Sequence, residues 1–338
     1  MMAPERGDGS ARLLAIATVV LVLAAARAAR PVLVPLVFAL FFTALLWPLQ
    51  RRLQRRLPRG LSAVITTLVF LGFAAALGGA AVAAVDTFAE RGAPHVARME
   101  RIARDALAWL AGRGLHLDDA GFGGLHARTV DLARGAVEVF TGTVLVVAFL
   151  LLCLLEVTSF REKLRRIKGE RGEGWFGAID RLAADLRRYA VVRTLVGLIS
   201  GAGTALVCVL VGVDFAAIWG VLAFLLNYVP TVGSIVAVAP PLLLAAAQFD
   251  DPIRVVLTLA GLAGMQLLTG NTIDPLVQGR YLRLSPLVVL LSVVFWGWFW
   301  GLPGAFLSVP ITVAVAVATR RDERTRWIAT LLAGSHNG

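Results

Sequence analysis

Long apolar runs constrain this sequence more than any other feature. A helix needs about 17–25 mostly apolar residues to cross a hydrocarbon layer about 30 Å thick. The runs of that length are Leu13–Ala29, Val32–Leu49, Leu61–Val85, Val137–Val157 and Thr194–Val213. The composition agrees, because 58% of the residues are hydrophobic and 16% are charged, against about 45–50% and 25% in soluble domains. The sequence therefore predicts an all-α, polytopic helical membrane protein rather than a disordered chain or a soluble enzyme.

The charges between the runs predict the orientation. Loop 50–60 has a net charge of +5, segment 158–193 also has +5, and segment 86–138 has −1. Positively charged loops stay in the cytoplasm, so we expect loop 50–60, segment 158–193 and both termini there, with 86–138 outside. The same rule accounts for the net charge of +11. No zinc-ligand spacing or RNA-binding motif accompanies this charge, so nucleic acid is not an expected partner.

These boundaries divide the chain into six predicted segments, with about eight spans in all. We expect the first run to remain as a span, because acidic residues interrupt the basic stretch that a signal peptide would have. The segments are membrane helices 1–3 at 1–85, an extracytoplasmic amphipathic helical segment at 86–136, membrane helix 4 at 137–157, a cytoplasmic amphipathic helical segment at 158–193, a transport region at 194–319 and a cytoplasmic tail at 320–338.

The apolar segments of the C-terminal half are short and interrupted. Phe215–Leu226 is too short to span, and a Pro/Gly turn separates it from the next apolar stretch. Leu287–Trp300 is interrupted in the same way. Paired broken segments are typical of transporters with repeat symmetry, so we expect two interrupted helical hairpins, either re-entrant or spanning; two ordinary helix pairs joined by tight turns are the alternative. The predicted breaks are at Pro230, Gly233, Pro240, Pro275, Gly279, Pro286, Pro303, Gly304 and Pro310.

Polar residues beside these breaks are the candidates for binding a solute or an ion. Unwound backbone at membrane depth is tolerated where it lines a cavity, and helix ends there supply dipoles. The candidates are Asn227, Thr231, Ser234, Gln266, Asn271, Asp274 and Gln278. Asp274 is the best-placed acid; alternatively it caps a helix or pairs with Arg280 or Arg283. We find no catalytic, metal-binding, cofactor or nucleotide-binding motif.

Several motifs of the C-terminal half are recognisable as a set. They are Tyr228-Val-Pro230-Thr-Val-Gly233, Asn271-Thr-Ile-Asp-Pro275-Leu-Val-Gln-Gly279, Leu284-Ser-Pro286, Gly301-Leu-Pro-Gly304 and Ser308-Val-Pro310. With a weaker pattern at Pro35, Pro48 and Gly60, they resemble the autoinducer-2 exporter family of bacterial permeases. The resemblance implies a multi-span transporter of the cytoplasmic membrane, homo-oligomeric and pentameric, with an elevator-like movement. Some members of that family are associated with sodium/proton antiport.

The sequence departs from that family at three places. Ser234 stands where a second proline is often found, and Val192-Arg193 stands where a Gly-Gln pair is common. The aromatic stretch Phe295–Trp300 is bulkier than usual. If that stretch lines the path, the resemblance does not carry the substrate over to this chain, so the family name does not identify the substrate.

Together these observations predict a secondary transporter of the bacterial inner membrane. We expect it to export a small, autoinducer-2-like signalling molecule by alternating access, driven by H⁺ or Na⁺ because no ATP-binding loop is present. Its expected partners are the lipid bilayer, the solute, the coupling ion and further copies of the chain. The alternatives are a sodium/proton antiporter and a non-transporting membrane scaffold. An intramembrane enzyme would need a motif that is absent here.

Overall fold

Helices make up nearly all of the described chain. The computed structural model describes residues 7–92, 94–95, 98, 101, 128–168, 170–230, 232–273, 284–320 and 325–332. The all-α prediction is confirmed. The elements are α1 (Gly7–Ala28), α2 (Arg30–Leu53), α3 (Arg59–Arg91), α5 (Arg128–Lys168), α6 (Glu170–Val211), α7 (Ala216–Leu226), α8 (Val232–Gln248), α9 (Pro252–Leu267), the π-helix η1 (Leu268–Ile273), α11 (Pro286–Trp300), α12 (Leu302–Thr319) and α13 (Arg326–Leu332).

Five of the described helices are long and apolar enough to cross a membrane, and five shorter helices are also apolar. Large apolar side chains such as Leu206, Val209 and Leu210 on α6 are exposed, as expected where lipid replaces water. The polytopic membrane architecture is therefore confirmed. The long candidates are Arg30–Leu53, Arg59–Ala80, Phe176–Val211, Pro252–Gly270 and Leu302–Thr319.

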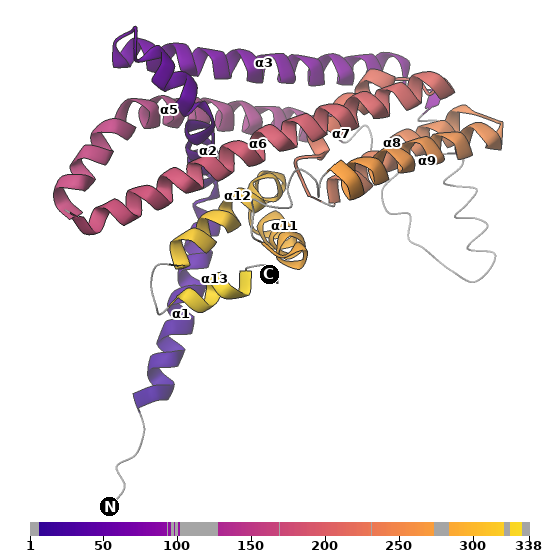
Figure 1. Ribbon diagram of the computed structural model, residues 1–338. Helices are drawn as coiled ribbons and strands as arrows, with labels where there is room; N and C mark the ends of the chain where they lie inside the picture. The colour runs from indigo at the N-terminus through magenta and orange to yellow at the C-terminus, as the bar shows by residue number, and fades with distance from the viewer. Residues whose placement is uncertain are drawn as a thin grey trace, which may run out of the picture.

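The helices α5 and α6 continue through the boundaries predicted at 157 and 193. They contain 41 and 42 residues, which corresponds to about 60 Å each at 1.5 Å per residue. Figure 1 shows them folding back on one another, with α3 running beside α5. The predicted amphipathic segment 158–193 thus forms the adjoining parts of these two helices. Of the predicted extracytoplasmic segment 86–136, α3 forms the beginning and α5 the end, and residues 102–127 lie outside the described chain.

The first helix does not fold back along the second. Only Ala29 separates α1 from α2, and in Figure 1 α1 extends away from the other helices. Its described side chains are almost all exposed. Contacts near its C-terminal end join it to α11, because the Trp300 indole N–H donates to Ala26 O (3.4 Å) and the Arg27 guanidinium lies 4.6 Å from the Trp298 ring centre.

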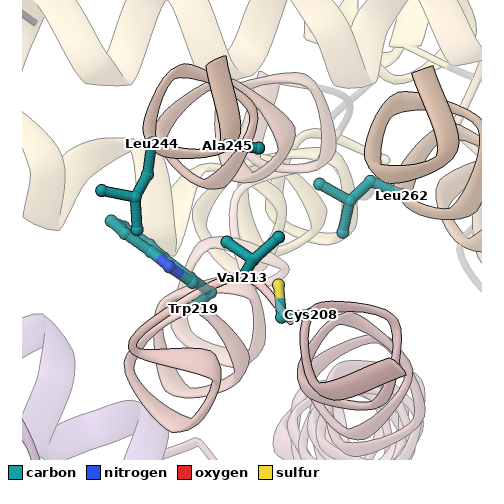
Figure 2. Packing of buried hydrophobic residues seen from close by; sticks show 6 residues of the cluster. All are labelled: Cys208, Val213, Trp219, Leu244, Ala245 and Leu262. Atoms are coloured by element: carbon teal, nitrogen blue, oxygen red, sulfur yellow. The ribbon is translucent and has the colours of Figure 1, made fainter. Parts of the chain in front are cut away.

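A hydrophobic core joins the first broken hairpin to its neighbours. Figure 2 shows Trp219 of α7 against Leu244 of α8, with side chains from α6 and α9 nearby. This packing holds α7 and α8 against α6 and α9, so the predicted transport region includes α6 as a structural support. The buried residues of the cluster are Cys208, Val213, Trp219, Leu244, Ala245 and Leu262.

Candidate functional site

The first break lies between α7 and α8. The Val229 N–H donates to Leu226 O (2.9 Å), and the Gly233 N–H donates to Val229 O (3.0 Å), so the chain turns within a few residues. Gly233 is buried, and a Cβ atom there would overlap the carbonyl oxygen of Leu226. Only glycine allows this close approach of α8 to the end of α7.

The second break lies between α11 and α12 and has the same feature. The backbone turns at Gly301, which has a positive φ of 73°. Gly304 is buried, and a Cβ atom there would overlap the carbonyl oxygen of Trp296. Each hairpin therefore contains a glycine that packs directly on a carbonyl of its preceding helix. The two interrupted hairpins of the predicted fold class are present.

The remaining predicted breaks behave differently. Pro240 and Pro310 lie inside α8 and α12, which continue through them. Each removes one backbone donor without ending its helix. Pro286 is the first residue of α11, where a missing N–H costs nothing, and Ser285 caps this helix. Pro303 lies in the first turn of α12. Pro275 and Gly279 lie outside the described residues.

The two breaks come together in space. Tyr228, two residues before Pro230, stacks on Phe306, two residues after Gly304, with ring centres 4.8 Å apart and planes 19° apart. The Tyr228 hydroxyl also shares a hydrogen bond of 2.7 Å with the hydroxyl of Thr194 in α6. The junction of the two hairpins therefore rests on the middle of α6.

Two of the predicted polar candidates are buried without hydrogen-bond partners at one atom. Asn227 is 7% exposed, and its side-chain Nδ2 has no hydrogen-bond partner. Gln266 is half-buried, and its side-chain Oε1 also has no hydrogen-bond partner. Ser234 is half-buried beside the first break. Asn271 lies in η1, with only its backbone described. Thr231, Asp274 and Gln278 lie outside the described residues.

The structure also reveals a row of buried polar residues that the sequence patterns did not single out. Arg193, Ser200 and Thr204 of α6 are 3%, 1% and 1% exposed, and their spacing of seven and four places them on one side of the helix. Arg193 is the only charged side chain among the buried residues of the described chain. It stands at the end of a basic amphipathic stretch, and Tyr189, one turn earlier on α6, packs with Val309 and Val313 of α12.

A second buried polar contact joins the N-terminal helices. The Thr66 hydroxyl of α3 donates to Gln50 Oε1 of α2 at 2.8 Å, and both residues are fully buried. Gln50 Nε2 is left without a partner. The sequence places Gln50 just beyond an apolar run, where an exposed position is the ordinary expectation.

Contacts beyond α3 tie the predicted outer segment to the hairpin region. His95 Nε2 lies 3.1 Å from Asp214 Oδ2 in the α6–α7 turn. Arg98 pairs with Asp250 in the α8–α9 turn. Gln248 reinforces this end, because its side chain bonds both Asp214 N (2.9 Å) and Gly212 O (2.8 Å). Segments distant in sequence therefore meet at one end of the hairpin region.

Comparison with known proteins agrees with this architecture. Residues 16–321 match the model of a family described as AI-2E family transporter. The chain belongs to this family. It is 38% identical over 182 residues to the AI-2 transport protein TqsA of Escherichia coli K12, which is 54% of this chain and 52% of TqsA.

Two further relatives are similar over longer stretches. A provisionally named transport protein of Mycobacterium tuberculosis, MT0215, is 31% identical over 270 residues, 75% of this chain and 72% of its own. A Borreliella burgdorferi relative with a provisional name as a transport protein is 32% identical over 222 residues, 65% of this chain and 61% of its own. The chain thus spans about half to three-quarters of these relatives. By its family and its long apolar helices, it is a multi-pass membrane protein.

Proposed function

We propose that this protein is a secondary transporter that exports a small, autoinducer-2-like signalling solute across the bacterial cytoplasmic membrane. The main support is the meeting of two broken hairpins beside a buried amide with a free donor. Broken helices expose backbone groups and dipoles to a bound solute. The name of the relative TqsA supports the solute class.

The proposed mechanism is alternating access around the Tyr228–Phe306 contact. In this scheme the two stacked rings separate when the solute passes between the hairpins. Asn227 stands one residue from Tyr228 and binds the solute in this scheme. The hinge glycines, Gly233 and Gly304, keep each hairpin close-packed as it moves.

The proposal also includes the coupling ion, the assembly and the topology. An H⁺ or Na⁺ gradient drives export, with Asp274 as the acid that responds to the ion. Both termini face the cytoplasm, because the positive loops do. The working unit is a homo-oligomer, pentameric as the family resemblance implies.

The test compares the solutes of cells and medium by mass spectrometry. Cells carry no transporter, the wild type, Asp274→Asn or Thr258→Val, at matched membrane levels. Thr258 is a suitable control because its buried hydroxyl bonds only Arg254 O of its own helix (2.8 Å). We expect a solute that accumulates outside with the wild type and the control, and at least about tenfold more slowly with Asp274→Asn, as loss of about 1.4 kcal/mol of coupling would give.

Three results would contradict the proposal. Equal solute levels with and without the protein would remove the export function and favour a scaffold. Gradient-dependent Na⁺/H⁺ exchange in vesicles, with no exported solute, would favour the antiporter. Full gradient-dependent export by Asp274→Asn would remove the acid from the mechanism.

A further inference from the structure

We propose that the exported solute is an organic anion and that Arg193 binds its negative group. This inference rests on the proposed transport function and specifies the charge of its substrate. It starts from the burial of Arg193, which is 3% exposed in α6. A guanidinium stays protonated in proteins, so its charge is permanent at this position.

Arg193 lies within Phe176–Val211, a stretch long and apolar enough to cross a membrane, and an ionisable residue inside such a stretch is a candidate functional site. In the described chain Arg193 is the one charged residue among the buried set. Of the other charged residues of α6 whose side chains are described, Asp180, Arg181 and Arg188 are exposed, and Asp185 and Arg187 are half-buried. A guanidinium on the buried side of α6 favours a negatively charged or acceptor-rich solute.

The neighbours of Arg193 place it at the junction of the two hairpins. The next residue, Thr194, bonds Tyr228 at the first break. One helical turn earlier, the Tyr189 ring lies 5.8 Å from the Arg193 guanidinium carbon. Tyr189 in turn packs with Val309 and Val313 of α12. Arg193 thus stands where α6 contacts both the first break and α12.

Hydrogen-bond donors accompany this charge. Ser200 Oγ on the same side of α6 and Asn227 Nδ2 at the end of α7 are both buried without partners, and a buried unpaired polar atom has a cost of about 1–3 kcal/mol. A hydroxyl and an amide N–H on the same region of α6 and α7 as a guanidinium suit a solute with a carboxylate, phosphate or similar oxygen-rich group. A bound anion would satisfy groups that are otherwise costly to bury.

The experiment asks which charge class of solute leaves the cell. Cells carry no transporter, the wild type, Arg193→Gln, Arg193→Lys or Arg181→Gln. Arg181→Gln is the matched control, since it makes the same change on an exposed position of the same helix. The medium is separated by anion exchange at pH 7, and solutes that depend on the wild type are identified by mass spectrometry in each fraction.

We expect the wild-type-dependent solutes in the anionic fraction. Their export falls at least about tenfold in Arg193→Gln, as expected for loss of a charge-assisted hydrogen bond, while Arg193→Lys keeps part of it and Arg181→Gln stays within about twofold. The ratio of anionic to neutral solutes exported also falls in Arg193→Gln. A purely structural role would lower both classes together and leave this ratio unchanged.

The outcomes separate the two proposals. Wild-type-dependent solutes that are neutral or cationic, or full anion export by Arg193→Gln, would overturn this inference and leave the transport function standing. No wild-type-dependent solute at all would overturn the transport function itself.

Asn227→Asp provides a second variant if Arg193→Gln fails to reach the membrane. It keeps the shape of the side chain and adds a negative charge at the first break. We expect it to reduce anion export at least about tenfold through like-charge repulsion. Export of the anion by Asn227→Asp at the wild-type rate would overturn the inference.

Discussion

The two broken hairpins share one backbone feature but differ in whether their buried polar side chains have hydrogen-bond partners. In each, a buried glycine packs on a carbonyl of the preceding helix. At the second hairpin the polar side chains are satisfied: Trp296 Nε1 donates to Thr312 Oγ1 (3.2 Å), and Ser308 and Thr312 bond their own helix. At the first, Asn227 keeps a buried donor free. In the proposed function, the first hairpin binds the solute and the second supports it.

The close packing of a glycine in each hairpin predicts the largest effect on stability. Gly233→Ala and Gly304→Ala each place a methyl group within the van der Waals radius of a carbonyl oxygen of the preceding helix. We expect a loss of about 3 kcal/mol or more in each case, seen as a lower thermal midpoint of the purified protein and less protein in the membrane. Gly264→Ala is the control, because a Cβ there has open space. Tolerance at one hairpin only would show that the two breaks are not equivalent.

The next prediction separates the hairpins by function. Asn227→Leu removes a buried donor that has no partner, so stability should stay constant or rise by about 1–2 kcal/mol. Export should fall at least about tenfold, since one solute hydrogen bond is lost. Thermal unfolding and rates of solute efflux measure the two quantities. A large loss of stability with unchanged efflux would assign Asn227 a structural role.

At the second hairpin the opposite pattern is expected. Trp296→Phe keeps a ring among Phe295, Phe299 and Trp300 but removes the hydrogen bond to Thr312. The expected cost is about 1 kcal/mol of stability, with efflux within about twofold of the wild type. A tenfold loss of efflux at normal stability would place the solute at the second hairpin as well.

The smallest effect is expected at the His95–Asp214 pair. Asp214 is about half exposed, and pairs of this kind contribute about 0–1 kcal/mol. A double-mutant cycle with His95→Ala and Asp214→Asn, measured by thermal unfolding, isolates this coupling. A coupling well above 1 kcal/mol would show that the outer segment contributes strongly to the stability of the first hairpin.

The structural features predicted from the sequence are those that depend on residues close together in the chain. Gly233 and Gly304 follow prolines between apolar stretches, and both lie at real interruptions. Pro240 and Pro310 lie in similar apolar stretches, yet the helices continue through them. A proline removes one donor, and whether the helix ends there depends on the packing around it.

The site itself depends on contacts between distant parts of the chain. Tyr228 and Phe306 belong to different hairpins, and no local pattern in either one specifies their stacking. Arg193 belongs by sequence to a solvated basic stretch, and that local pattern does not specify its burial. The spacing of Arg193, Ser200 and Thr204 on one side of α6 can be read from the sequence. Isolated polar residues within an apolar run are common, so their spacing alone did not mark them as a site.

The stacked Tyr228 and Phe306 rings have a consequence for the resting populations of the protein. An aromatic pair of this kind contributes about 0.5–1.5 kcal/mol beyond simple burial. Alone, that free energy would keep the two breaks together in about 70–90% of molecules and apart in the rest. The contact therefore favours one arrangement without locking it. A solute or an ion gradient that shifts the balance by more than this same amount of about 0.5–1.5 kcal/mol, at most about 2 kcal/mol, is enough to reverse which arrangement is common.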